Sequence, residues 1–152
     1  MKIRLDDLNG PQIRALLEEH LADMHSQSPP ESVHALDLER LRQPDIRFWT
    51  VWSAQEELMG CGALKRLDGA HGEIKSMRSA RAFRGCGVGR AMLLHILEEA
   101  AAAGFKRLSL ETGTQPGFTA ARALYASHGF ETCGPFEGYV EDPNSVFMTR
   151  LL

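Results

Sequence analysis

Hydrophobic and polar residues recur along this 152-residue chain with two periods, one typical of strands and one typical of helices. Strand-like patterns occur at 2–6, 46–54, 58–67, 73–79, 106–111, 130–133 and 145–151. Helical spacing begins at Pro11 and ends near Met24, resumes between Pro30 and Pro44, follows the glycines at 85–89 as far as about Ala103, and recurs over 118–128. The predicted order is β-α-α-β-β-β-α-β-α-β-β in one domain covering residues 1–152, an α/β (α+β) arrangement.

Particular residues refine three of these elements. The first helix is expected to place Ile13, Leu16, Leu17 and Leu21 on one side. The strand at 46–54 carries aromatic residues on both faces, which predicts a central position in the sheet. Glycines at 60 and 62 in the next strand indicate a bulge or the close approach of a helix, rather than a ligand site.

One stretch joins these elements in an order that is typical of phosphate binding. The strand at 73–79 leads through an arginine-rich bend to Gly85, Gly87 and Gly89, which open a long amphipathic helix. The first turn of a helix leaves backbone N–H groups without partners, and the helix dipole adds positive potential there. Glycines keep side chains out of that space and tolerate left-handed backbone angles. The loop is therefore predicted to bind an anion, with Arg84 and Arg90 as flanking charged donors.

Two common phosphate motifs fit this loop poorly. A dinucleotide site requires a third glycine, but counting from Gly85 reaches Arg90 and counting from Gly87 reaches Met92. A nucleoside-triphosphate loop requires Gly-Lys-Ser/Thr, which does not follow. Cys86 within the loop is a possible nucleophile, but the sequence favours a bystander role for it.

The run from Arg84 to Gly89 resembles the acetyl-CoA signature of the GCN5-related N-acetyltransferase (GNAT) family, Gln/Arg-x-x-Gly-x-Gly/Ala. A second match lies downstream, where Ala121, Tyr125 and Gly129 followed by Phe130 are similar to the family's Ala-x-x-x-Tyr-x-x-x-Gly-Phe. Phe118 departs from the pattern, because many members carry Asn at that position. The resemblance covers residue 46 to the C-terminus well, and residues 1–45 only in general layout.

The resemblance implies the fold and the cosubstrate. It implies a mixed, mostly antiparallel sheet of six or seven strands with about four helices, splayed between its two parallel strands. The pantetheine arm of acetyl-CoA is expected to pair with the strand edge from Met77 to Ser79. The residues expected to hold its diphosphate are Arg84, Gly85, Cys86, Gly87, Val88, Gly89 and Arg90. Many relatives dimerise, so a homodimer is possible.

The resemblance also implies catalytic roles. Tyr125 matches the family's general acid, which protonates the departing thiolate. Glu73 is the first candidate for the base that deprotonates the amine, because it precedes Arg84 by the spacing of the catalytic glutamate in histone-type members. A structural Glu73 paired with Lys75 or Arg107 is an equal alternative, and Glu111 is the second candidate base. Many members use neither and rely on water.

The resemblance also implies that the first two helices and their connection form one wall of the acceptor pocket. His20, His25 and His34 are candidate acceptor contacts there, although surface or packing roles are favoured for each one. A small-molecule amine is the leading acceptor. A non-catalytic acyl-CoA sensor is the second hypothesis, and protein N-terminal or lysine acetylation is the third.

Composition narrows the remaining classes. A formal net charge of −3 argues against a general nucleic-acid binder. Three scattered cysteines indicate neither a disulfide framework nor a metal site, and fit a reduced, cytoplasmic setting. The N-terminal residues show no signal peptide, and no run reaches the length of a membrane span. These features predict a soluble enzyme that uses no metal.

Overall fold

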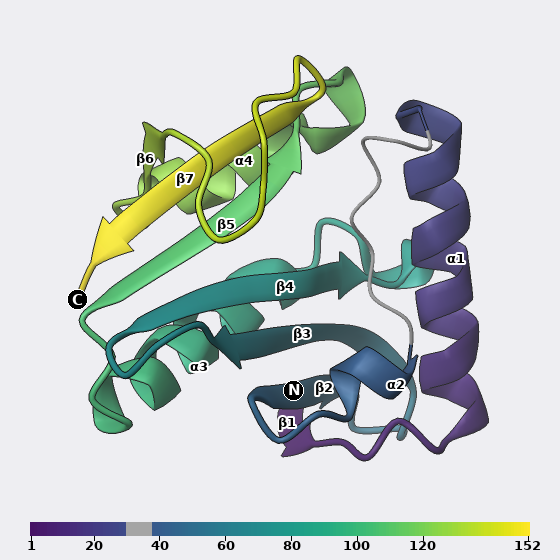
Figure 1. Ribbon diagram of the computed structural model, residues 1–152. Coiled ribbons are helices and arrows are strands. Elements are labelled where there is room, and N and C mark those ends of the chain that lie inside the picture. Colours follow the sequence, from purple (N-terminus) through teal and green to yellow (C-terminus); the bar gives the residue numbers. More distant parts are fainter. Residues whose placement is uncertain (30–37) are drawn as a thin grey trace.

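The computed structural model describes residues 1–29 and 38–152, which form seven strands and four α-helices (Figure 1). The strands are β1 (Lys2–Leu5), β2 (Ile46–Trp52), β3 (Leu58–Arg66), β4 (His71–Ser79), β5 (Arg107–Gly113), β6 (Glu131–Cys133) and β7 (Ser145–Leu151). The α-helices are α1 (Pro11–Gln27), α2 (Leu38–Leu41), α3 (Val88–Ala102) and α4 (Thr119–Ser127). Short 3₁₀ helices at Arg81–Phe83 and Pro116–Phe118 precede α3 and α4.

The seven strands form one sheet in the order β1-β2-β3-β4-β5-β7-β6. Only β4 and β5 run parallel among these pairs, and α3 makes the crossover between them. The remaining neighbours pair antiparallel. The predicted mixed, mostly antiparallel sheet with about four helices is therefore confirmed.

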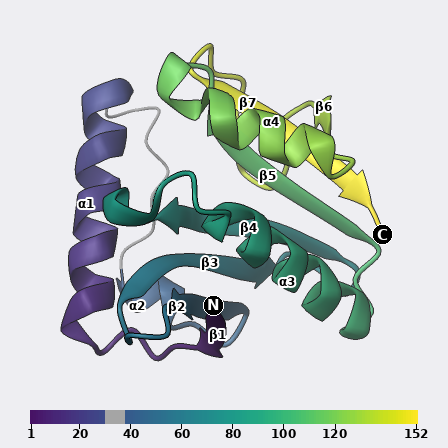
Figure 2. The same cartoon turned by 180° about the vertical axis from the view of Figure 1, so that it is seen from behind.

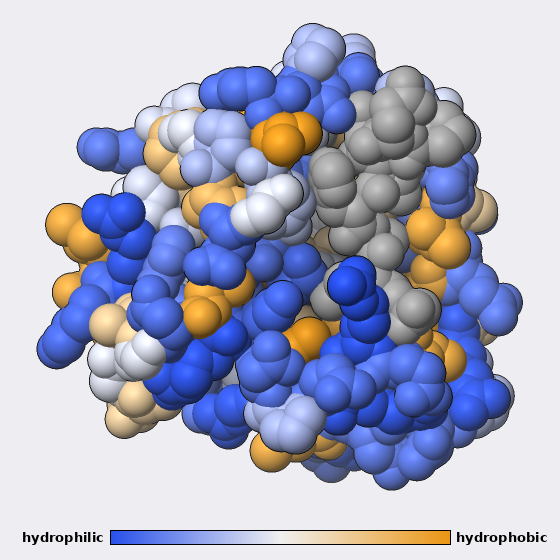
Figure 3. Space-filling view, viewed as in Figure 1, coloured by the Kyte–Doolittle hydropathy of each residue, from blue (hydrophilic) through white to orange (hydrophobic). Residues whose placement is uncertain are grey.

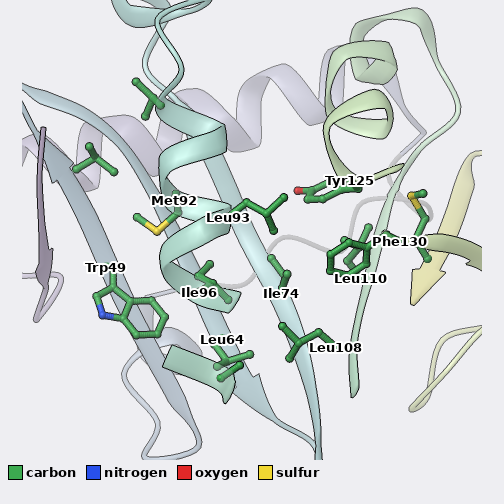
Figure 4. Close-up of a cluster of buried hydrophobic side chains, with 14 of the residues drawn as sticks. Trp49, Leu64, Ile74, Met92, Leu93, Ile96, Leu108, Leu110, Tyr125 and Phe130 are labelled. Atoms are coloured by element: carbon green, nitrogen blue, oxygen red, sulfur yellow. The ribbon is translucent and has the colours of Figure 1, made fainter. Parts of the chain in front are cut away.

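Helices pack on both faces of the sheet. The two views of Figures 1 and 2 place α3 and α4 together on one face. Their core, drawn in Figure 4, includes Trp49, Leu64, Ile74, Met92, Leu93, Ile96, Leu108 and Leu110. The second core joins α1 and α2 to the opposite face through Ile13, Leu16, Leu41, Phe48 and Ala63. Neighbouring residues of β2, such as Phe48 and Trp49, thus belong to different cores, as strand alternation requires.

Glycines in β3 let α3 approach the sheet closely. A Cβ atom built on Gly60 would lie 2.6 Å from a Val88 methyl group, and one on Gly62 would lie 2.6 Å from Met92. Real Cβ atoms essentially never come this close to another heavy atom. The close approach of a helix is therefore confirmed, and the pairing of β3 is also irregular beside Gly60, because Val51 pairs with Gly60 while Trp52 pairs with Leu58.

The sheet opens between β4 and β5, as Figure 1 shows. The parallel pairing starts at His71 with Arg107 and ends at Ile74 with Leu110. Beyond Ile74, β4 pairs only with β3, and an extra residue between Lys75 and Arg78 disturbs that register. Ser76 has a φ of 55° at this bulge. The bulge brings both Ile74 and Met77, three positions apart, onto the α3 core.

Several element boundaries differ from expectation; for example, β4 begins at His71 instead of Glu73, and β5 continues to Gly113 instead of ending at Glu111. The first helix continues to Gln27 instead of ending near Met24, because Ser28 still donates its N–H to the Met24 carbonyl at 2.9 Å. Leu21 is 40% exposed and does not belong to the buried side of this helix. The second predicted helix lies largely outside the described residues, which include only its end as α2.

Candidate active site

The glycine loop meets the N-terminus of α3 as an open backbone turn. Gly85 and Gly87 have φ angles of 77° and 82°, in the left-handed region that favours glycine. No heavy atom lies within 4 Å of a Cβ built on either residue. The space in front of the first turn is therefore free for an anion, and the unpaired N–H groups of that turn point toward it.

The neighbouring residues of the loop have different environments. Gly89 lies inside the first turn of α3, where a built Cβ would be 3.4 Å from Leu124, so this glycine serves helix packing. The Val88 side chain is buried in the α3 core, so only the backbone of this residue is available to an anion at the loop. Cys86 and Arg90 are exposed.

Three arginines before the loop are bound to α1. Asp23 accepts hydrogen bonds from Arg78 at 2.5 Å, from Arg81 at 2.6 Å and from Arg84 at 3.3 Å. Glu19 accepts a second bond from Arg78 at 2.6 Å. The carboxylates of α1 thus neutralise much of this arginine cluster, and Arg84 is directed at Asp23 instead of standing free beside the glycines.

An Asp23→Asn variant should lose about 2 kcal/mol of stability, since a hydrogen bond between charged groups contributes roughly 1.5–3 kcal/mol. The bond from Arg78, and then that from Arg81, lowers the pKa of Asp23 to about 2. A depressed carboxyl pKa stabilises the fold above the ordinary pKa near 3.8, and this stabilisation is lost as the pH falls toward 2. Urea unfolding between pH 5 and 2.5 should therefore give a shallower pH dependence in the variant. Glu18→Gln, at an exposed position on the same helix, is the matched control and should keep the wild-type slope.

A cavity of about 110 Å³ occupies the opening between β4 and β5. Its lining comes from α1 and its C-cap, from β4 and β5, from α4 and the segment leading into it, and from the loop between β6 and β7. The lining residues are His20, Met24, Ser28, Glu73, Ile74, Lys75, Ser76, Met77, Glu111, Thr112, Gly113, Phe118, Ala121, Tyr125, Tyr139 and Asn144. The structure therefore brings together Glu73, Glu111, Tyr125 and His20 around one space.

Glu73 belongs to a buried network. Its Oε2 atom accepts a hydrogen bond from Tyr139 at 2.6 Å and one from Lys75 Nζ at 2.8 Å. Lys75 Nζ also lies 3.2 Å from the Tyr139 hydroxyl oxygen. The side chains of Lys75 and Glu73 are only 9% and 4% exposed. The predicted alternative of a Glu73 paired with Lys75 is thus what the structure contains, while Arg107 is not its partner.

Glu111 is the second carboxylate of the cavity. It stands on β5 just beyond Leu110, the last residue paired with β4. Burial raises the pKa of Glu111 to about 7, and the neighbouring Ser145 hydroxyl and the charge of Lys75 only partly oppose that rise. A carboxylate with such a pKa exchanges a proton near neutral pH, which is the property a general base needs.

Tyr125 projects from α4 into the same space. Figure 4 shows its hydroxyl directed toward Leu93 on α3, and the ring meets Phe130 edge to face at a centroid distance of 5.8 Å. Burial raises the pKa of Tyr125 above the ordinary value near 10, so the phenol keeps its proton at neutral pH. Within the described part of the chain, its hydroxyl forms no hydrogen bond.

The three candidate histidines fall into three situations. His20 lines the cavity, and its buried Nδ1 atom has no hydrogen-bond partner among the described residues. Burial, assisted by the charge of Arg78, lowers the pKa of His20 to about 4, so the ring is neutral at pH 7. His25 is exposed and lies outside the cavity lining. His34 lies outside the described residues.

Sequence reasoning missed Tyr139 as a site residue. It lies in the irregular segment between β6 and β7, where no periodic pattern predicts which side chains turn inward. The available signal in the sequence was the pair of aromatic residues Phe136 and Tyr139, three positions apart. Their rings pack together with a centroid distance of 5.1 Å. Asp23 was missed because its arginine partners lie 55–61 positions away in sequence.

Neither a membrane-spanning helix nor a metal-binding cluster occurs among the described residues. No helix among them is both long and apolar enough to cross a membrane. The same residues contain no group of three or more His, Cys, Asp or Glu side chains arranged to hold a metal ion.

Comparisons with known proteins agree with this geometry. The model of the Acetyltransferase (GNAT) family matches residues 13–130. The chain is 56% identical over 152 residues, the full length of both chains, to the uncharacterized N-acetyltransferase YsnE of Bacillus subtilis (strain 168). It is 43% identical over 138 residues to the IAA acetyltransferase of Azospirillum brasilense, covering 90% of this chain and 86% of that protein.

Among solved structures, the putative acyl-CoA N-acyltransferase from Klebsiella pneumoniae subsp. pneumoniae MGH 78578 superposes with a TM-score of 0.85. The two sequences are 29% identical, and the match covers 99% of this chain and 97% of the other. The similarity therefore extends over both halves of the splayed sheet.

Proposed function

We propose, from the premise that this chain belongs to the GNAT family of acetyltransferases, that it moves the acetyl group of acetyl-CoA directly to a small-molecule primary amine. Both substrates would be bound together during the transfer. The chain is an N-acetyltransferase by family, and the identity of its acceptor and the roles of its residues are the content of the proposal.

The observation that carries the proposal is the shared cavity at the sheet opening. The edge of β4, at Ser76 and Met77, forms one part of its wall, and Glu111 and Tyr125 form another. An amine and a thioester placed in this space would meet beside a carboxylate and a phenol. A module that only bound acyl-CoA would need neither group.

The residues present suit the two polar parts of acetyl-CoA. The open turn at Gly85 and Gly87 has room for a diphosphate in front of the N-terminus of α3. Beyond Ile74, the β4 edge that faces the opening is not paired with β5, so its backbone groups can bond the amides of the pantetheine arm. The bound cosubstrate would supply the activated acetyl group.

The cavity residues divide the proton transfers between them. Glu111 would accept a proton from the amine, which is mostly protonated at neutral pH because its pKa is near 10. The new nitrogen–carbon bond forms as the carbon–sulfur bond breaks, and Tyr125 would give its proton to the departing sulfur. The second proton, which the nitrogen loses on becoming an amide, would restore the Tyr125 phenol. A backbone N–H of the strand near Met77 would stabilise negative charge on the carbonyl oxygen. Glu73 remains a candidate base, but its carboxylate is already bound by Lys75 and Tyr139.

A Glu111→Gln variant should lower kcat/KM at pH 7 by roughly 10- to 100-fold, at the lower end of the usual contribution of a general base. Glu111 acts as a base only when ionised, so the wild-type kcat/KM should rise with pH and level off above about 7. In the Glu111→Gln variant, the rise of kcat/KM toward pH 7 should disappear. The remaining activity should increase with pH as the amine itself loses its proton. Glu73→Gln is the comparison. If the rise of kcat/KM toward pH 7 disappeared in Glu73→Gln but remained in Glu111→Gln, Glu73 would be the base.

The proposed reaction is tested by release of free thiol from acetyl-CoA in the presence of primary amines, with the acetylated product identified by mass spectrometry. The panel should include amino acids, diamines and a lysine-containing peptide. IAA should be tested as a separate acceptor, because the relative from Azospirillum brasilense is named IAA acetyltransferase. Turnover on a small amine supports the proposal. Binding of acetyl-CoA without turnover on any acceptor would favour a sensor, and turnover on the peptide alone would favour protein acetylation.

A further inference from the structure

Lys75 gives the acceptor side of the cavity one fixed positive charge. Its side chain is 9% exposed and belongs to the cavity lining. An ammonium group has three N–H donors, and Lys75 uses two of them, toward Glu73 and Tyr139. One donor remains for a ligand, on a cation that its neighbours hold in a single position.

Apart from Glu111, the other ionisable groups that surround Lys75 in the cavity are either paired or neutral at pH 7. Glu73 and Lys75 compensate each other at 2.8 Å, and His20 is neutral at pH 7. Glu111 is then the one remaining ionisable carboxylate among the described lining residues. The cavity therefore offers one site for a positive group, at Glu111, and one donor for a negative group, at Lys75.

From this arrangement, and resting on the proposed function, we infer that the acceptor is an amino acid or a similar small zwitterion, whose carboxylate is bound by Lys75 while its amine faces Glu111. The shared hydroxyl of Tyr139 keeps Lys75 and Glu73 in place as the carboxylate enters. A polyamine fits this cavity less well, because its second cation would approach the Lys75 ammonium.

The inference is tested by comparing an amino acid with its own carboxamide. L-leucine and L-leucinamide, and L-phenylalanine and L-phenylalaninamide, differ only in the charged group. The amide has the less basic amine, so it would be the better substrate if the fraction of free amine alone decided the rate. We expect kcat/KM to be instead about 10- to 100-fold higher for the amino acid, the range for a hydrogen bond between charged groups.

The role of Lys75 is tested by a double variant, Glu73→Gln with Lys75→Met. Replacing both partners avoids leaving one buried charge alone, which a single substitution would do. The double variant should bring the ratio of kcat/KM for the amino acid to kcat/KM for the amide down to about 1 or below, whatever its absolute activity. Lys106→Met, which makes the same chemical change at an exposed site, should keep the preference.

The possible outcomes separate this inference from the function on which it rests. If the wild-type protein acetylates leucinamide or a plain amine better than leucine, the inference is wrong and the acetyltransferase proposal stands. An unchanged preference in the double variant also overturns it. If no amine of either kind is acetylated, the proposed function fails and the inference fails with it.

Discussion

A Gly87→Val variant should bind acetyl-CoA at least about 100-fold more weakly than the wild-type protein. The φ of Gly87 is 82°, and no atom lies within 4 Å of the position where a side chain would begin. A valine would therefore occupy the space proposed for the diphosphate and block the backbone N–H groups behind it. Losing two charge-assisted hydrogen bonds of roughly 1.5 kcal/mol each corresponds to a factor of about 100 or more. Isothermal titration with acetyl-CoA measures this directly.

Backbone strain at Gly87 needs its own control, because a valine with positive φ costs about 1–3 kcal/mol wherever it stands. Gly104 provides it. This glycine follows the opposite end of α3, has a φ of 85°, and likewise has no atom within 4 Å of a built Cβ. Gly104→Val should lose similar stability and retain full affinity. Equal loss of affinity in the two variants, or normal binding by a folded Gly87→Val protein, would contradict the proposed diphosphate site.

The order of elements was predictable because each one obeys a local rule. Strand alternation and helical spacing depend on residues that are close in sequence, and the glycines after α3 and α4 have the positive φ that ends a helix. Gly104 and Gly129 could be assigned this role without coordinates. The same logic failed for Leu21, because a helical wheel shows which residues share a side but not how far the partner surface extends.

The candidate site was only partly predictable, because its contacts join distant segments. The carboxylates at 73 and 111 could each be named from the sequence, but their different environments could not. Glu73 is held by Tyr139, 66 positions away, whereas Glu111 is buried at the end of the parallel pairing. Burial and partners decide which carboxylate can exchange a proton near neutral pH. The spacing between Glu73 and Arg84, which favoured Glu73 as the base, reveals neither the burial nor the partners of the two carboxylates.

The face of the molecule that Figure 3 shows is mostly hydrophilic. Figure 3 shows hydrophobic residues there scattered singly among hydrophilic ones, which is ordinary for a protein surface. Exposed apolar residues such as Leu5, Val140 and Leu151 lie on different strands and loops.

A Tyr125→Phe variant should reduce kcat by about 100- to 1,000-fold while changing the affinity for acetyl-CoA less than about twofold. The general acid contributes roughly 10²–10⁴ to a rate, and without it the sulfur must leave as an unprotonated thiolate. The ring remains, so its packing against Phe130 and the shape of the cavity are preserved. Single-turnover acetyl transfer measures the rate, and titration with acetyl-CoA measures the affinity.

Tyr139→Phe is the matched control, because it removes another hydroxyl from the same cavity without removing the proposed acid. That hydroxyl donates to Glu73, so the control should weaken binding of the acceptor more than it slows the transfer from a saturated complex. A loss of acetyl-CoA affinity in Tyr125→Phe as large as its loss of rate would instead make Tyr125 a binding residue. An unchanged kcat would leave protonation of the sulfur to water.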